Sequence, residues 1–227
     1  MGWQHFGGGW RHCRWWGGRG GRHAGPMSTS ENAAGAVVGK IGEIGDTGEA
    51  GEIVPDTKDW TWVLERRCPD CGLDTPGVVR EDVAGMIRAN AEGWLAVLAG
   101  DEDGLRRRPA PGVWSDLEYA CHVRDVFRLF DVRLGLMLDR DDPLFPNWDQ
   151  DETAVAERYG EQRPQVVAGE LAEAAETLAA AFKGVTGEQW RRTGNRSDGA
   201  RFTVESFARY LIHDPVHHLF DVTGERV

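Results

Sequence analysis

Four segments of the chain repeat apolar residues every three or four positions, and this pattern constrains the fold most strongly. They cover about residues 80–98, 115–139, 164–182 and 203–221. Such a repeat places the apolar side chains on one face of an α-helix, which can then be buried against other helices. No stretch of residues 57–227 alternates apolar and polar residues as a half-buried strand would. We therefore predict an all-α fold, a four-helix bundle.

Residues that favour helix starts stand at the borders of these segments. Ser115 followed by Glu118 is the pattern of a capping box, in which each side chain satisfies a backbone N–H of the first turn. Pro164 suits the first turn of the third helix, and Thr203 is a suitable cap for the fourth.

The connection between the second and third helices, residues 139–164, is long for a loop inside a compact domain. Asp149 can cap a short helix over residues 153–159. Phe145 and Trp148 either clip this crossover to the bundle or help to line a pocket. The sequence does not decide between these two interpretations.

The N-terminal part differs in composition from the rest. Residues 1–26 contain nine glycines, four arginines and no acidic residue, and we expect Met27 to be the native start. A basic arm for nucleic acid is the alternative. We interpret residues 1–56 as a disordered tail, residues 57–78 as an ordered arm, and residues 79–227 as the bundle.

The overall charge argues against several classes of partner. The net charge is −11, which disfavours nucleic acid or an anionic membrane as the main partner. No apolar run approaches the roughly 18 residues that a membrane-spanning helix needs. Four cysteines in 227 residues do not make a disulfide framework, so we expect a cytoplasmic protein.

The last predicted helix carries a histidine pair with metal-ligand spacing. His213 and His217 are four residues apart, so their imidazoles point to similar sides of a helix. A third ligand must come from another element, and His122 in the second helix is the best candidate. Considered alone, His122 would be interpreted as a core histidine. Neutral imidazoles suit zinc, nickel or iron, and the sequence does not distinguish these metals.

Pro215 lies between the two histidines. Its ring removes one helical hydrogen bond, so it either kinks the helix beside the predicted site or ends the helix at the Asp-Pro step. The apolar pattern continues beyond it, which favours a helix that runs on.

Cys68 and Cys71 form a second motif, Cys68-Pro-Asp-Cys71-Gly, in the arm. It resembles one knuckle of a zinc ribbon, but the second CxxC of such a site is missing. Three interpretations stay open: an unligated arm, a structural metal site or disulfide, and a redox-active thiol pair.

Three motifs follow one another along the chain: Pro111-Gly-Val-Trp114-Ser115, His122 and His213-x-x-x-His217. In this order they resemble the DinB superfamily, whose metal-binding bundles include bacillithiol and mycothiol S-transferases. The resemblance covers about residues 79–222 and implies a long crossover between helices 2 and 3. It also implies that His122, His213 and His217 hold one divalent metal. The CxxC arm is not part of the general family pattern.

The resemblance implies a metal-dependent thiol S-transferase in which mycothiol or bacillithiol attacks an electrophilic small molecule. Metal-assisted hydrolysis is the second hypothesis, and a non-enzymatic, stress-related metal-binding protein acting through a partner or a homodimer is the third. Three carboxylates lie near the ligands in sequence and can orient their second ring nitrogens: Glu118, Asp125 and Asp221. His218 is a candidate base or pocket wall. Three arginines can anchor the cofactor: Arg124, Arg128 and Arg209.

Overall fold

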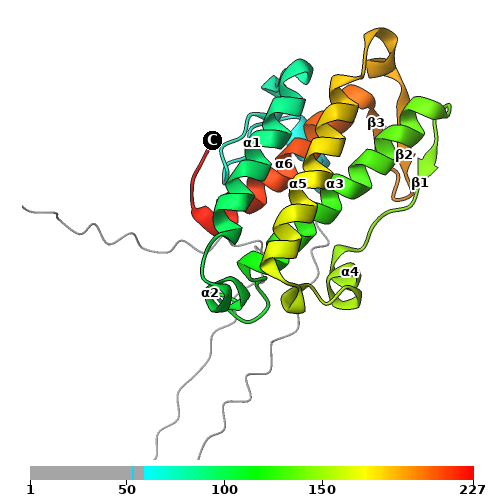
Figure 1. Ribbon diagram of the computed structural model, residues 1–227. Coiled ribbons are helices and arrows are strands. Elements are labelled where there is room, and N and C mark those ends of the chain that lie inside the picture. The colour runs from blue at the N-terminus through cyan, green and yellow to red at the C-terminus, as the bar shows by residue number, and fades with distance from the viewer. Residues whose placement is uncertain (1–52, 54–58) are drawn as a thin grey trace, which may run out of the picture.

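Four long helices form the body of the molecule (Figure 1). A computed structural model describes residue 53 and residues 59–227. The long helices are α1 (Val83–Leu98), α3 (Asp116–Asp139), α5 (Pro164–Lys183) and α6 (Val204–Thr223). The predicted all-α four-helix bundle is confirmed. The expectations for the tail, including a start at Met27, lie outside the described residues.

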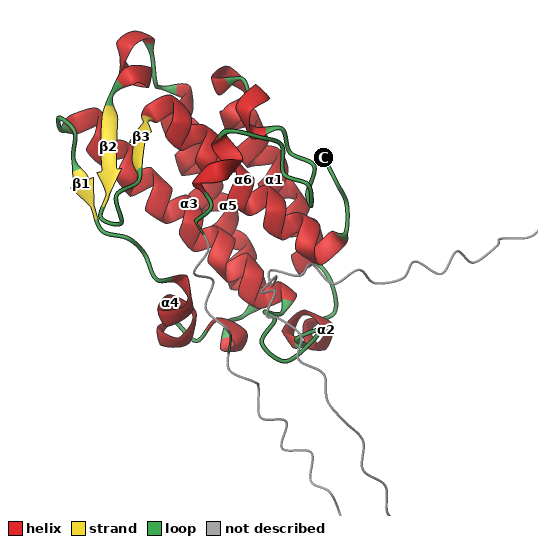
Figure 2. Cartoon of the chain, turned by 180° about the vertical axis from the view of Figure 1, so that it is seen from behind, coloured by secondary structure: helices red, strands yellow, loops and turns green. Residues whose placement is uncertain are grey.

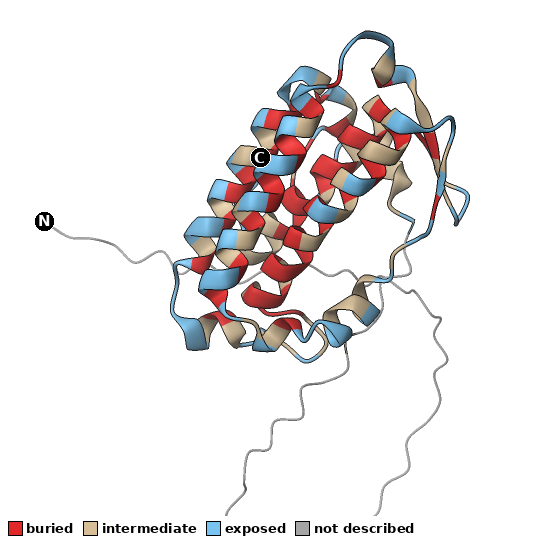
Figure 3. Ribbon diagram, turned by 45° about the vertical axis from the view of Figure 1, so that its right-hand side comes forward, coloured by how far each residue is buried: buried red, intermediate tan, exposed pale blue. Residues whose placement is uncertain are grey.

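The helices pack with their apolar faces inward. Helices α1 and α3 each contact both α5 and α6, so α5 and α6 occupy opposite corners of the bundle. The buried positions of each helix face its neighbours, as Figure 3 shows by colour. Trp94, Phe127 and Leu211 are among the largest fully buried side chains. Within the described part, no helix is both long and apolar enough to cross a bilayer.

Polar side chains fix where the helices begin. Ser115 accepts a hydrogen bond from the backbone N–H of Glu118, and the Glu118 carboxylate accepts one from the N–H of Ser115, which completes the predicted capping box. Thr203 caps α6 in a similar way. Pro164 stands in the first turn of α5, where a missing N–H costs nothing.

Short helical segments complete the connections. Helix α2 (Glu102–Arg106) follows α1, and α4 (Gln150–Ala156) lies in the crossover between α3 and α5. Asp149 caps α4, as the sequence indicates, by accepting hydrogen bonds from two backbone N–H groups of its first turn, and the helix lies three residues earlier than the expected 153–159. Single 3₁₀ turns occur at Thr61–Leu64, Thr75–Gly77, Arg80–Asp82, Tyr159–Glu161 and Gly187–Arg191.

A small sheet, which we did not expect, ties down the crossover. Strand β1 (Leu144–Phe145) pairs in parallel with β2 (Thr193–Arg196), and β2 pairs antiparallel with β3 (Arg201–Thr203). Figure 2 shows this sheet at one end of the bundle, with the crossover continuing from β1 to α4. The strands have two to four residues, too few for an alternating pattern to be recognised. Phe145 is buried, so it clips the crossover to the core.

Helix α6 runs through Pro215 without interruption, and the alternative that the Asp-Pro step ends the helix is wrong. The side-chain amide of Asn90 on α1 donates a 2.8 Å hydrogen bond to the Pro215 carbonyl. This buried bond joins α1 to the part of α6 that carries the histidines.

The sheet generates a stability prediction. A methyl group on Gly194 would lie 2.8 Å from Met137 Cγ and 2.9 Å from Phe145 Cε1, so Gly194→Ala should lower the free energy of unfolding by about 1–3 kcal/mol. Gly169→Ala is the matched control at an exposed position of α5, where no other atom lies within 4 Å of the added methyl group. It should raise that free energy by about 1 kcal/mol through helix propensity. Urea unfolding followed by circular dichroism measures both; equal stability of the two variants would contradict this packing.

Candidate functional site

One turn of α6 carries two pairs of polar residues with metal-ligand spacing. His213 and His217 form one pair, and Asp214 and His218 form the next. Successive residues of a helix differ in direction by about 100°, so the two pairs make neighbouring stripes that meet different parts of the fold. His213, His217 and His218 are all buried.

The stripe of Asp214 and His218 meets His122 on α3. Their ligand atoms all lie within 4.8 Å of one another. His122 Nε2 is 3.4 Å from Asp214 Oδ1, and His218 Nε2 is 3.9 Å from the same oxygen. Two imidazoles and a carboxylate therefore converge on one point.

His122 is held in an aromatic environment. Its ring stacks on Trp148 at a centroid distance of 5.3 Å and an interplanar angle of 3°, and Trp114 lies 5.2 Å away. Neither ring nitrogen has a hydrogen-bond partner among the described residues. Burial lowers the pKa of His122, which favours the neutral imidazole that a metal requires.

Asp214 is suited to be the anionic member of this group. Burial works to raise the pKa of its carboxyl, but the imidazoles of His122 and His218 outweigh that effect and hold the pKa below its ordinary value. Within the described structure, its Oδ1 makes only the two long contacts to these imidazoles and no hydrogen bond of good geometry. The side chain is 34% exposed, so this group can be reached from outside.

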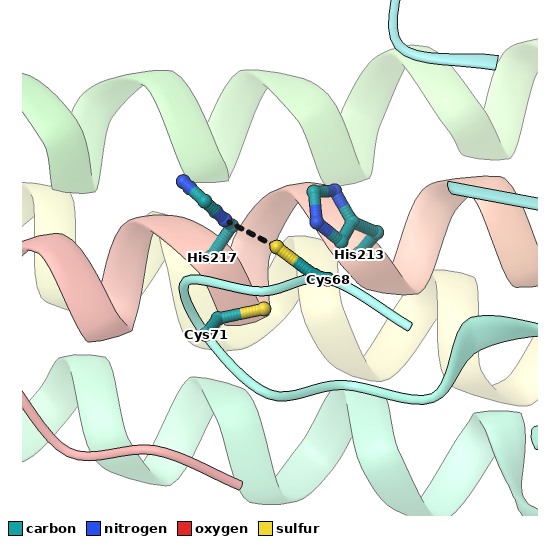
Figure 4. A group of neighbouring side chains, drawn as sticks. All are labelled: Cys68, Cys71, His213 and His217. Atoms are coloured by element: carbon teal, nitrogen blue, oxygen red, sulfur yellow. Dashed lines mark hydrogen bonds between the residues drawn. The ribbon is translucent and has the colours of Figure 1, made fainter. Parts of the chain in front are cut away.

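The stripe of His213 and His217 meets the arm instead. Figure 4 shows these two imidazoles beside the thiols of Cys68 and Cys71. The ligand atoms of all four residues lie within 4.8 Å of one another, and all four residues are buried. Cys68 Sγ is 3.5 Å from His217 Nδ1. Both cysteines are free, so the predicted alternative of a disulfide is not what this structure contains.

The two thiols differ in proton affinity. The hydrogen bond from Cys71 holds the pKa of the Cys68 thiol well below its usual value, against the effect of burial, and contacts with His213 and His217 lower it further. The same sulfur–sulfur contact, together with burial, raises the pKa of the Cys71 thiol. These contacts favour the thiolate form of Cys68, and thiolate is the form that binds metals.

Asp221 connects the two groups. Its Oδ1 lies 3.6 Å from His217 Nε2, and its Oδ2 lies 3.1 Å from His218 Nδ1. A carboxylate in this place fixes the orientation of both rings. Asp125 has another role, because it pairs with Arg124 and accepts a 2.6 Å hydrogen bond from the Tyr159 hydroxyl.

The predicted three-histidine set is divided between the groups. The structure brings His213 and His217 together, whereas His122 lies with Asp214 and His218. One metal held by His122, His213 and His217 therefore stays a prediction. Sequence reasoning missed Asp214 as a ligand candidate, although its spacing to His218 repeats that of the histidine pair.

A cavity of about 710 Å³ lies beside these groups and is lined in part by His213, Asp214, His217 and His218. Other residues of its wall come from the arm, the crossover and the β2–β3 turn: Asp59, Trp60, Thr61, Asn147, Trp148, Asp149, Gln150, Asp151, Asp198, Gly199 and Ala200. The crossover packs on the core through Phe145 and also lines the cavity with residues 147–151. Both interpretations of this segment are therefore correct.

The cations of the cavity wall are Arg133 and Arg196, which sequence reasoning did not single out. Burial, and then the charge of Arg196, lowers the pKa of Arg133 to about 10, so it remains a cation at neutral pH. Its Nη2 donates to the Pro146 carbonyl at 2.7 Å, while its Nε has no partner in the described structure. Arg196 pairs with Asp198 and donates to the Tyr210 hydroxyl.

The arginines expected to anchor a cofactor do not line this cavity. Arg124 and Arg128 pair with Asp125 and Glu170. Arg209 donates to the Val78 carbonyl and pairs with a neighbouring glutamate on α6.

Comparison with known proteins identifies the family. The profile of the DinB superfamily matches residues 85–220, more than half of the chain, and the chain therefore belongs to the DinB superfamily. The fold is similar to that of YfiT from Bacillus subtilis, described as a probable metal-dependent hydrolase with an unusual four-helix bundle topology. That similarity has a TM-score of 0.52 and 19% sequence identity, over 64% of this chain and 80% of YfiT. No curated protein matches the chain.

The position of Asp221 generates a prediction about metal affinity. Asp221→Asn should weaken metal binding by about 10–100-fold, because an amide orients the two imidazoles less well than a carboxylate. Asp125→Asn is the matched control and should leave metal affinity within about twofold, since its partners are Arg124 and Tyr159. Competition with a chelating dye measures both. Equal effects of the two substitutions would show that Asp221 has no special role.

Proposed function

We propose that this DinB protein is a metal-dependent thiol S-transferase whose His122, Asp214 and His218 hold one divalent transition-metal ion. The observation that supports this assignment is the convergence of three donor side chains beside the cavity, where His122 Nε2 and His218 Nε2 lie 3.4 and 3.9 Å from Asp214 Oδ1 and make no hydrogen bond of good geometry to it. Buried polar atoms without good hydrogen bonds are costly, and a cation bound between one His122 nitrogen and Asp214 Oδ1 would satisfy both atoms.

The donor set fits a catalytic rather than a structural metal site. Two imidazoles and one carboxylate bind zinc in hydrolytic enzymes and iron in non-haem oxygenases, and in both cases they leave a position open. A divalent ion held there favours the thiolate form of a thiol that reaches it. The chain keeps its donors in place through Asp221, which contacts His218, and through Trp148, which stacks on His122.

The cavity wall suits a polar, anionic thiol. Arg133 and Arg196 are both cations of this wall, and the buried Nε–H of Arg133 has no hydrogen-bond partner in the described structure. Guanidinium groups bind carboxylates well, and Asn147 and Tyr210 add hydrogen-bonding groups for sugar hydroxyls. A cavity of about 710 Å³ is large enough for one drug-sized molecule. Mycothiol or bacillithiol has this chemistry, and we propose a low-molecular-weight thiol of that kind as co-substrate.

The proposed reaction forms a carbon–sulfur bond. The sulfur of the thiol attacks an electrophilic carbon, and the leaving group departs with its electron pair while the thiol proton passes to solvent. In an addition to an unsaturated acceptor, that proton ends on the neighbouring carbon instead. Arg133 and Arg196 would orient the thiol, and Trp60 and Trp148 offer apolar surface to the electrophile.

Hydrolysis at a metal site is helped by a carboxylate that takes a proton from water. Three acids of the cavity wall have other partners: Asp198 pairs with Arg196, Asp149 caps α4, and Asp59 accepts hydrogen bonds from Thr61. These interactions leave fewer carboxylates for that role and support the transferase proposal.

The ligand assignment is tested with metal-loaded protein, a panel of low-molecular-weight thiols including mycothiol and bacillithiol, and a bimane or dinitrophenyl electrophile. Mass spectrometry should detect the thioether product. His122→Ala should lower kcat/KM by at least about 100-fold. Loss of a residue that only orients a metal ligand costs about 10–100-fold, and His122 is proposed as a ligand itself. Cys121→Ala, the preceding residue of α3, is the control and should retain activity. Hydrolysed electrophile without incorporated sulfur would support a hydrolase instead.

The anchoring role of Arg133 generates a separate prediction. Arg133→Gln should raise KM for the thiol by about tenfold or more with little change in kcat, since a charge-assisted hydrogen bond contributes about 1.5–3 kcal/mol. Arg128→Gln is the matched control on exposed α3 surface, outside the cavity wall. Steady-state kinetics with the thiol varied gives both constants. Unchanged KM in Arg133→Gln would contradict the proposed orientation of the co-substrate.

A further inference from the structure

We propose that Cys68, Cys71, His213 and His217 form a second metal site, a closed structural zinc site that is separate from the cavity group. Its ligands come from two distant parts of the chain, the arm and α6 (Figure 4). This site does not depend on the proposed transferase activity.

The spacing of the four side chains fits tetrahedral zinc. Zinc binds thiolate sulfur at about 2.3 Å and imidazole nitrogen at about 2.0–2.1 Å, so a sulfur and a nitrogen at two corners of a tetrahedral site lie about 3.6 Å apart. Cys68 Sγ and His217 Nδ1 are 3.5 Å apart. All four ligand atoms lie within 4.8 Å of one another, so small side-chain rotations would complete the site.

The arm has the backbone of a metal-binding knuckle. The N–H of Gly72 donates to the Cys68 carbonyl at 3.1 Å, and the N–H of Cys68 donates to the Leu73 carbonyl at 2.9 Å. Gly72 has a φ of +87°, a conformation that favours glycine, and an added Cβ would lie 2.8 Å from the Val227 carbonyl oxygen. This tight turn holds the two thiols on the same side.

A zinc ribbon takes its other two ligands from a second CxxC motif. Helix α6 supplies two ligands in its place. His213 and His217 are one helical turn apart and offer two nitrogens on one stripe. Two cysteines and two histidines are the ligand set of many structural zinc sites, and four protein ligands leave no position for a substrate.

The surroundings of the group also indicate a structural role. Trp60 stacks on His213 at a centroid distance of 5.6 Å and lies equally far from His217, so an indole ring stands against both imidazoles where they border the cavity. Asp221 Oδ1 lies 3.6 Å from His217 Nε2, as a carboxylate behind a metal-binding histidine does. The C-terminal residues cover the knuckle, where the N–H of Val227 donates to the Cys71 carbonyl at 3.1 Å.

A hydrogen bond between the Cys68 thiol and the His217 imidazole would explain the 3.5 Å contact, but nothing else about the group. It does not explain why a second thiol and a second imidazole converge on the same point. His213 Nε2, in a residue that is 4% exposed, has no partner within the described structure. One zinc ion accounts for the convergence and for the position of the arm on α6.

The first test is a mercurial titration of the full chain, which needs no variant. A reagent that caps thiols should release one zinc ion as Cys68 and Cys71 react, detected with a metal-sensitive dye. The ion of the cavity group should stay bound, because none of its ligands is a thiol. Rapid reaction of these thiols without release of zinc would overturn the proposal.

Matched variants then separate the two sites. Elemental analysis of zinc-loaded protein should give two ions per chain, one in the Cys68→Ala/Cys71→Ala variant and two in Cys121→Ala, whose buried thiol lies in neither group. His122→Ala should lose only the cavity ion, so failure of the proposed function and failure of this site give different results. If the double variant retains two ions, the structural zinc site is wrong.

Cobalt substitution tests the ligands directly. Co²⁺ in this site should show thiolate-to-metal charge transfer in the near ultraviolet and the intense visible bands of tetrahedral cobalt. Both features should persist in His122→Ala. Their absence from the cobalt-loaded full chain would overturn the assignment, whatever its total metal content.

Discussion

The geometry of one short stretch of α6, residues 213–218, determines how the candidate metal ligands are grouped. His213 with His217 and Asp214 with His218 repeat the same four-residue spacing, but they point about 100° apart. One pair faces the arm and the other faces α3, so we propose that each pair serves a different ion. Asp221, at the end of the same helix, contacts a histidine of each pair. The remainder of the fold supplies partners for these two stripes.

Those partners come from segments outside the four-helix core. The arm brings Cys68 and Cys71 to one stripe, and the crossover brings Trp148 against His122 at the other. The crossover is fixed in turn by pairing of β1 with β2 and by burial of Phe145. Aromatic rings on both sides exclude water from the imidazoles. Removing water strengthens the preference of such nitrogens for a metal or another partner.

The sequence predicts the framework better than the site. Helix starts at Ser115, Pro164 and Thr203 follow from local capping chemistry, which needs no tertiary information. The short strands could not be predicted, because β1 pairs with a segment about 50 residues away and the local β2–β3 hairpin has strands too short to show alternation. The grouping of ligands depends on which stripe of α6 meets which neighbour. Periodicity identifies such stripes but does not say what covers each one. The wall cation Arg133 was missed for the same reason, because its helical position shows burial and not the cavity beside it.

The most direct measurement is a crystal structure of the zinc-loaded full chain with anomalous data collected at the zinc absorption edge. The division of ligands described above requires two anomalous peaks. One should lie among Cys68, Cys71, His213 and His217, and the other among His122, Asp214 and His218. A single peak bound by His122, His213 and His217 together would contradict the central claim and restore the three-histidine site that the sequence suggests.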